Sequence, residues 1–366
     1  MTDIVAQRMA RLRETMRATG TGLVVLGPGS HMQWLAGFYP HPDERPALLL
    51  VGQDKAGLLM PALNAEASKL STDLPMFVWA DAEGPDAALK AALDAIFPAR
   101  SGRVVLDETM RADFALLVLD ALPPLARAFT DDTVGRLRAS KDDEEYRKLK
   151  ASALLNDRAM QAAWAALRPG VTETAVADVV KEFFAANGAR VQFAIVGASE
   201  NGAHPHHATG SRVLKRGDAV VIDIGGRIDG YPSDMTRMGI IGEPPAGYAE
   251  IHAIVEKAVQ AALAAARPGG KAKDVDKAAR DVIAAAGYGE YFVHRTGHGL
   301  GIDVHEPPYI TATSDTVLAE GMVFSIEPGI YLPGRFGIRL EDIVILRGDG
   351  PEILSGLSRD AHVAAD

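Results

Sequence analysis

The segment GDAVVIDIGGRIDGYPSDMT, residues 217–236, predicts a buried strand, a tight hairpin and a returning strand. Asp229-Gly230 is a strong signal for a type I′ turn, and that turn pairs Asp223 with Thr236. Asp234 lies two residues from Thr236, so both Asp side chains are expected on one face, roughly 7–8 Å apart as diagonal neighbours. An acid that ends an apolar strand is costly without a partner. The pattern therefore favours a bound cation over the alternative of a turn acid and a cap.

The second half of the chain contains an internal repeat. Arg168-Pro169-Gly170 recurs 99 positions later as Arg267-Pro268-Gly269. Further along, GDAVVID (217–223) resembles GMVFSIE (321–327) at an offset of 104. Each half is predicted as a helix, a loop with His, a strand with an acid, and a hairpin with a second acid. Two such halves about a pseudo-two-fold axis would bring their acids together. The alternative is chance similarity among Ala-rich helices.

Two histidines occupy corresponding positions of this repeat. His206 falls on His305 at the offset of 99, in the same order relative to the acids, which weakens the explanation by chance. We expect the two side chains on opposite sides of one site, as hydrogen-bond donors. A solvated loop is the alternative for any one histidine of NGAHPHHATG (201–210).

Acids also end or interrupt the apolar strands of the second repeat. Glu327 follows MVFSI (322–326), and Glu341 and Asp342 lie between Ile338-Arg339-Leu340 and Ile343-Val344-Ile345. Alternation with period two puts Arg339 and Glu341 on one face and Asp342 on the other. We expect Glu341 in the site and Asp342 as a structural partner, with the reverse assignment as the alternative.

A glycine-rich loop, TGHGLG (296–301), carries His298. Its glycines permit close backbone approach. A phosphate loop is the rival interpretation, but the spacing is not that of a P-loop and no helix is evident after it. His294, His298 and His305 are too many for satisfied core histidines in one short loop. One is expected as a metal ligand and the others as donors or proton carriers.

Five side chains thus form a candidate site for two divalent ions: Asp223, Asp234, His298, Glu327 and Glu341. Four carboxylates and one imidazole suit oxygen-preferring ions better than a thiolate zinc site. Four negative charges repel one another strongly unless cations neutralise them. Two divalent ions can drive metal-assisted hydrolysis. Mn(II) is the first expectation, with Co(II) or Zn(II) as alternatives.

The composition is that of an ordinary soluble globular protein. Of 366 residues, 48% are hydrophobic and 23% charged, with no Cys and a formal net charge of −10. The absence of Cys excludes disulfides and thiolate sites. No basic patch predicts a nucleic-acid partner, and no segment approaches the roughly 20 apolar residues of a membrane span. The N-terminus is predicted as a first helix and not a signal peptide. We expect a cytoplasmic protein that binds neither nucleic acid nor membrane.

The length fits two domains. Strands alternate with helices in the first part of the chain, which predicts an α/β domain. The acids of SKDDEE (140–145) suit the first turn of a new helix. We therefore divide the chain into an α/β domain, 1–138, and a catalytic domain, 139–366. In the first domain, polar and aromatic loop residues could line a cleft, although such scattered residues are usually surface: His31, Trp34, His41 and Asp43.

At these residues the chain resembles the pita-bread metallopeptidases: Xaa-Pro dipeptidase (prolidase), aminopeptidase P and, more distantly, methionine aminopeptidase. The resemblance covers about 140–357 in detail. The N-terminal region is similar to the creatinase-type domain, with weaker motifs such as HMQWLAGF (31–38). It implies an α/β creatinase-like domain, an α+β pita-bread domain with a pseudo-two-fold repeat, and a homodimer.

The resemblance also implies residue roles. Asp223 and Asp234 would be bidentate or bridging ligands, and His298 would bind one ion. Glu327 and Glu341 would complete the pair, and Glu327 would also be catalytic. The remaining implied roles are catalytic for His206 and His305, and substrate-binding for His294 and Arg339.

The implied activity is hydrolysis of the Xaa-Pro bond at the N-terminus of short proline-containing peptides. Many prolidases place an Arg shortly after the position of His305, where it meets the carboxylate of a dipeptide, whereas this chain has Tyr309. That difference slightly favours aminopeptidase P, and predicts that tripeptides are cleaved at least as well as dipeptides. Two alternatives are a metal-dependent hydrolase of a non-peptide amide and a catalytically silent peptide-binding module. The intact ligand set argues against the silent module.

Overall fold

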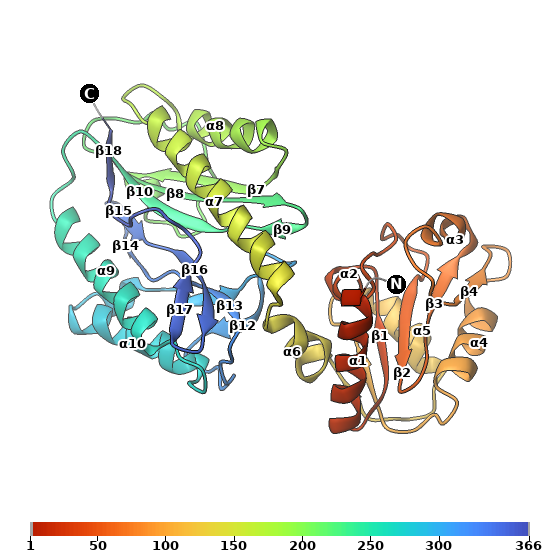
Figure 1. The fold of residues 1–366 in the computed structure, drawn as a ribbon. Coiled ribbons are helices and arrows are strands. Elements are labelled where there is room, and N and C mark those ends of the chain that lie inside the picture. The colour runs from red at the N-terminus through yellow and green to blue at the C-terminus, as the bar shows by residue number, and fades with distance from the viewer. Residues whose placement is uncertain (1–2, 365–366) are drawn as a thin grey trace. The chain divides into compact units, whose positions relative to one another are not determined.

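The computed structural model describes residues 3–364, and the chain divides into two compact units, 1–138 and 139–366 (Figure 1). Each unit has its own hydrophobic core. Among the described residues, no helix is both long enough and apolar enough to cross a membrane.

A mixed six-stranded sheet, flanked by helices, forms the described part of unit 1, in the order β4-β3-β2-β1-β5-β6. The strands are β1 (Thr21–Leu26), β2 (Leu48–Gly52), β3 (Ala56–Pro61), β4 (Met76–Trp79), β5 (Arg103–Leu106) and β6 (Arg127–Ala128). The helices are α1 (Asp3–Ala18), α2 (Ser30–Ala36), α3 (Ala62–Ser68), α4 (Asp86–Ile96), α5 (Ala112–Asp120), the 3₁₀ turn η1 (Thr130–Asp132) and α6 (Val134–Ala139).

Two of the residues of unit 1 that were predicted as candidates to line a cleft are instead buried within the unit. His31 is buried, and its ring nitrogens lie 3.1 Å from Glu108 and 3.0 Å from Arg138. Trp34 is buried in the core. His41 is exposed.

The described part of unit 2 is built from two helix pairs and three sheets. Its first repeat comprises α7 (Asp143–Ala166), α8 (Glu173–Ala186), β7 (Arg190–Ala198), η2 (Ser199–Asn201), β8 (Ala219–Ile228), β9 (Tyr231–Pro232) and β10 (Met235–Ile241). The second comprises α9 (Tyr248–Ala265), α10 (Ala272–Ala285), η3 (Gly289–Tyr291), β11 (Gly297–Gly299), β12 (Glu306–Ile310), β13 (Val323–Ile326), β14 (Gly329–Leu332), β15 (Phe336–Arg339), β16 (Asp342–Arg347), β17 (Gly350–Ile353) and β18 (His362–Ala364). The sheet orders are β18-β10-β8-β7, with β9 on β8, then β12-β11-β13-β16-β17, and β14-β15.

Backbone hydrogen bonds confirm that the two repeats correspond. Gly170 N–H donates to Leu214 C=O at 2.9 Å, and Gly269 N–H donates to Leu318 C=O at 2.8 Å. The two donors, Gly170 and Gly269, are 99 positions apart, and the two acceptors, Leu214 and Leu318, are 104 positions apart, which are the offsets found in the sequence. The RPG segment therefore begins the same helix-to-loop connection twice.

Strand alternation turns the acids toward the space between the repeats. Along β8, Val220 and Ile222 belong to the core beneath α7 and α8, whereas Ala219 and Val221 belong to the core of the second repeat. Asp223 has the parity of Val221, so its side chain faces the second repeat. Figure 1 shows the sheets between the two helix pairs.

The hairpin register is the predicted one. Asp229 and Gly230 both have positive φ, 50° and 82°, as a type I′ turn requires. Asp223 pairs with Thr236, and no bulge displaces the register between β8 and β10. The sequence of the turn thus fixes where Asp234 lies relative to Asp223.

Candidate metal centre

One cavity of unit 2, of about 710 Å³, contains every site residue predicted from the sequence. Those residues are Asp223, Asp234, His298, Glu327, Glu341, His206, His305, His294 and Arg339. Asp223, His298 and Arg339 lie in strands of the two repeats, and the others lie in loops or next to strand ends. The cavity is therefore the convergence point that the repeat predicted.

The four acids and His298 lie within ligand distance of common points. In this cavity, three sets of three side chains have ligand atoms within 4.8 Å of one another. Two of these sets together contain all five predicted ligands: the first is Asp223, Asp234 and Glu341, and the second is His298, Glu327 and Glu341. His298 Nε2 lies 3.6 Å from Asp234 and 3.4 Å from Glu327. One imidazole nitrogen and several carboxylate oxygens thus surround the same small volume.

Burial and mutual repulsion disfavour the charged forms of these acids. Burial, with the neighbouring carboxylates, raises the pKa of Asp234 and of Glu341 well above the ordinary range. Burial, partly opposed by Arg339, raises the pKa of Glu327 to about 7. Cations in the cavity would remove this penalty.

The donor set fits divalent ions, and one atom supports this directly. Asp223 Oδ1 is buried and has no hydrogen-bond partner among the described residues. A buried carboxylate oxygen without a partner costs free energy, and a ligand can supply what the protein does not. With the hard oxygen donors around it, this orphaned atom is what a cation site requires.

The orientation of His298 suits a metal ligand. Its Nδ1 lies 3.1 Å from the carbonyl oxygen of Gly299, so Nδ1–H donates and Nε2 keeps a lone pair toward the acids. Ser325 accepts the His298 N–H at 2.9 Å and donates to Glu327 at 3.2 Å. Burial lowers the pKa of His298 to about 3, which keeps the ring neutral.

Arg339 is fully occupied by the protein. It donates to Asp223 Oδ2 at 2.5 Å, to Thr236 Oγ1 at 2.9 Å and to the Tyr331 hydroxyl at 2.8 Å. A further donor reaches the Pro205 carbonyl at 3.4 Å. Tyr331 was not predicted from the sequence, because only the tertiary fold brings its buried hydroxyl to the Arg.

His294 is likewise held by protein partners. Its Nδ1 lies 2.7 Å from the Arg295 carbonyl and its Nε2 lies 2.8 Å from the Tyr331 hydroxyl. Burial, together with the charge of Arg339, lowers the pKa of His294 to about 4. The neutral ring with Nδ1–H as donor and Nε2 as acceptor satisfies both contacts.

The two histidines at corresponding repeat positions are exposed at the cavity wall, His206 and His305. The His305 ring centroid is 4.1 Å from that of His298, and one of its nitrogens shares a 4.8 Å group with Asp234 and His298. The loop's other histidines differ, because His207 bonds the buried Glu173 at 3.0 Å and His204 is exposed.

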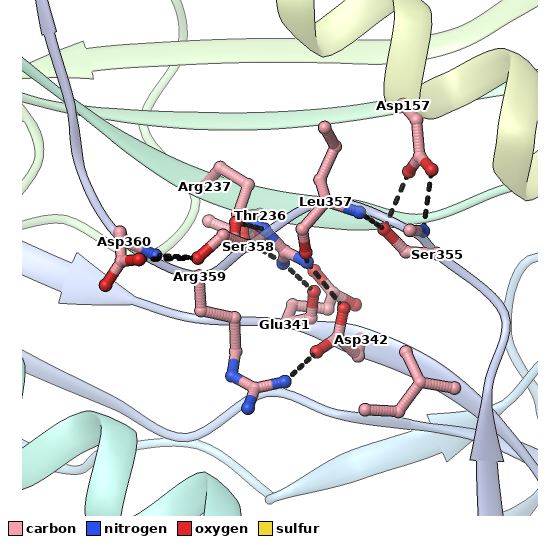
Figure 2. Close-up of polar contacts among 12 residues, drawn as sticks. Asp157, Thr236, Arg237, Glu341, Asp342, Ser355, Leu357, Ser358, Arg359 and Asp360 are labelled. Carbon is pink, nitrogen blue, oxygen red and sulfur yellow. Dashed lines mark hydrogen bonds and ion pairs between the residues drawn. The ribbon is translucent and has the colours of Figure 1, made fainter.

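A buried arginine behind the site holds the backbone at Glu341, immediately before β16 (Figure 2). Arg237 donates to the backbone carbonyl of Glu341 and, at 2.6 Å, to Asp342 Oδ1. Asp342 Oδ2 accepts from Arg359 at 2.6 Å. In front of this network, Thr236 donates to Glu341 Oε2 at 2.8 Å. Asp342 thus bonds two arginines behind the site, whereas Glu341 lines the cavity.

Replacing Asp342 with Ala should destabilise the protein by about 3–5 kcal/mol, because it leaves the charge of the fully buried Arg237 without its partner. Urea unfolding of the variant measures this loss. Asp360→Ala removes an exposed acid next to Arg359 and should change stability by less than about 0.5 kcal/mol. Equal effects of the two substitutions would contradict the structural role of Asp342.

The metal-free protein should lose stability as pH rises from 5 to 7, in part through Glu327. Its folded pKa of about 7 exceeds the ordinary 4.5, so the folded state keeps a proton that the unfolded chain releases. The contribution of protonated Glu327 to the free energy of unfolding is complete below pH 4.5 and is lost as pH rises through 7. Melting temperatures of wild type and Glu327→Gln test it, since Gln cannot ionise. The wild type should fall more steeply, and parallel curves would contradict the assignment.

A second cation in the cavity was missed from the sequence. Arg295 lines the cavity wall, and its Cζ lies 4.9 Å from the ring centroid of Tyr309. The motif HRTGH places it three residues before His298, which is the only sequence signal that could have indicated it.

Comparisons with known proteins agree with this geometry. Residues 147–347 match the metallopeptidase family M24, and residues 8–139 match the creatinase/prolidase N-terminal domain. The chain is 41% identical to the probable dipeptidase PepE of Mycobacterium tuberculosis, over 95% of this chain and 93% of that protein. It is 34% identical to the Xaa-Pro dipeptidase of Lactobacillus helveticus, over 96% and 98%.

A solved structure extends the comparison to the fold. The dipeptidase PepE from Mycobacterium ulcerans superposes with a TM-score of 0.93 at 37% identity, covering 99% of this chain and 98% of that one. These matches confirm the predicted creatinase-like domain followed by a pita-bread domain. Since the M24 match spans more than half of the chain, the chain belongs to metallopeptidase family M24 and is a peptidase.

Proposed function

We propose that the protein hydrolyses the Xaa-Pro bond at the N-terminus of short peptides with two divalent metal ions. The observation that carries the proposal is the convergence of four carboxylates and His298 on one cavity, where Asp223 Oδ1 lacks a protein partner. The relatives named dipeptidase and Xaa-Pro dipeptidase support the substrate class.

The residues that would hold the ions are those predicted from the sequence: Asp223, Asp234, His298, Glu327 and Glu341. When bound, divalent ions supply Lewis-acid polarisation of a carbonyl and favour deprotonation of water. Mn(II) stays a prediction, with Co(II) or Zn(II) as alternatives, as do the homodimer and the cytoplasmic location.

The chain's own side chains would bind the peptide and move its protons. We assign Glu327 as the general base, whose carboxylate oxygen accepts a proton from the water that attacks the scissile carbonyl. Glu327 then donates this proton to the prolyl nitrogen as the C–N bond breaks. His206 and His305 are assigned to donate hydrogen bonds to the peptide, because they are exposed at the wall. His294 and Arg339 both bond the Tyr331 hydroxyl. We therefore assign them to hold the substrate-binding wall of the cavity in place.

The test is hydrolysis of Xaa-Pro dipeptides and Xaa-Pro-Yaa tripeptides by metal-stripped protein, before and after addition of Mn(II), Co(II) or Zn(II). We expect activity only with added metal, and only on peptides with proline in the second position. Xaa-Ala peptides are the matched control. Metal-independent cleavage, or equal cleavage of Xaa-Pro and Xaa-Ala peptides, would contradict the proposal.

A further inference from the structure

We propose that Arg295, stacked on Tyr309, binds the C-terminal carboxylate of an Xaa-Pro dipeptide and makes this enzyme a dipeptidase. The inference rests on the proposed function and specifies its substrate. It replaces the slight preference for longer peptides that the Tyr at position 309 suggested.

The position of Arg295 suits a substrate contact. It lies in the cavity wall, half-buried, with the Tyr309 ring beneath its guanidinium. Within residues 3–364, no hydrogen bond or ion pair joins this guanidinium to a carboxylate. A guanidinium that stacks on an aromatic face keeps the N–H groups at its edge available for a planar, bidentate partner.

Arg339, the other arginine of the cavity wall, cannot serve the same purpose without loss. Its donors already reach Asp223, Thr236 and Tyr331, and it is 4% exposed. Diverting it to a substrate would leave Asp223 Oδ2 without its partner. Arg295 therefore carries the positive charge that is available to an incoming anion.

The charges of the cavity make such a cation necessary for a dipeptide. The wall carries four carboxylates, which two divalent ions would balance, and the positive charge of Arg339 is already directed at Asp223. A dipeptide brings its own carboxylate close to the scissile bond, and burying that charge unpaired is costly.

Peptide length follows from the position of the carboxylate. In Xaa-Pro the carboxylate is attached to the proline ring carbon, but in Xaa-Pro-Yaa a neutral amide takes its place. The next carboxylate lies about 3.5 Å further along the chain. One fixed guanidinium therefore favours the dipeptide over the tripeptide, and over the dipeptide amide.

The experiment compares Ala-Pro with Ala-Pro amide, which differ in the carboxylate charge, in the Mn(II)-loaded enzyme. Arg295→Gln should lower kcat/KM for Ala-Pro by roughly 10- to 100-fold, the usual effect of losing a charged hydrogen bond, and change Ala-Pro amide by less than about threefold. Arg295→Lys should recover only part of the loss, because Lys lacks the bidentate fork. Arg335→Gln is the matched control, because Arg335 also lies over a ring, Phe336, but outside the cavity wall.

Parallel losses on both substrates, or no loss on Ala-Pro, would overturn the assignment of Arg295. Failure of the proposed function would be distinct, since the wild type would then hydrolyse neither substrate. Calorimetric binding to the metal-free protein still decides the role of Arg295 in that case. The wild type should bind Ala-Pro more tightly than its amide, and Arg295→Gln should abolish the difference. A difference that persists in the variant would contradict the proposal.

Discussion

Asp223→Ala should remove bound metal and lower kcat/KM by roughly 1000-fold or more, because metal ions contribute several kcal/mol to transition-state stabilisation and each 1.4 kcal/mol is tenfold. Asp223 offers one oxygen without a protein partner and one that Arg339 bonds. Metal content by mass spectrometry and peptide hydrolysis together measure the effect.

Two further variants separate the charge of Asp223 from its hydrogen bond. Asp223→Asn keeps an acceptor for Arg339 but loses the charge, so it should also lose metal. Glu182→Ala, which removes an exposed acid of α8, should keep both metal and activity. Normal metal content and full activity in Asp223→Ala would refute the site.

His206→Ala and His305→Ala should each lower kcat by about 100- to 1000-fold while metal content stays unchanged. Positioned donors to a developing oxyanion contribute about this much. Both histidines are exposed at the cavity wall and come from corresponding positions of the two repeats.

His204→Ala is the matched control, because that exposed histidine of the same loop is outside the set that lines the cavity. It should leave kcat unchanged. His305 also lies close enough to Asp234 and His298 to compete for a ligand role. If His305→Ala lost as much metal as Asp223→Ala, it would be a ligand and its assignment as a donor would be wrong.

Local patterns were sufficient to predict much of this fold. Asp229-Gly230 determined the turn, and the turn determined the pairing of Asp223 with Thr236, because a two-residue hairpin leaves one register. Alternation in β15 and β16 separated Glu341 from Asp342. Each of these inferences needed only residues near in sequence.

Contacts between segments that are far apart in the chain could not be predicted from the sequence. The Tyr331 hydroxyl joins His294 to Arg339, and Arg237 reaches Glu341 and Asp342 across more than 100 positions. The role of Arg295 could not be predicted for the same reason, because its place over Tyr309 depends on how the loop before β11 lies against β12. No periodicity encodes such pairs, so a single arginine in a loop carries no sign of its role.

A crystal structure of the protein soaked in Mn(II), with anomalous scattering to locate the ions, tests the proposed metal centre directly. We expect two ions per chain, about 3.5–4 Å apart, within reach of Asp223, Asp234, His298, Glu327 and Glu341. An empty cavity at saturating Mn(II), a single ion, or ions bound away from these five side chains would contradict it.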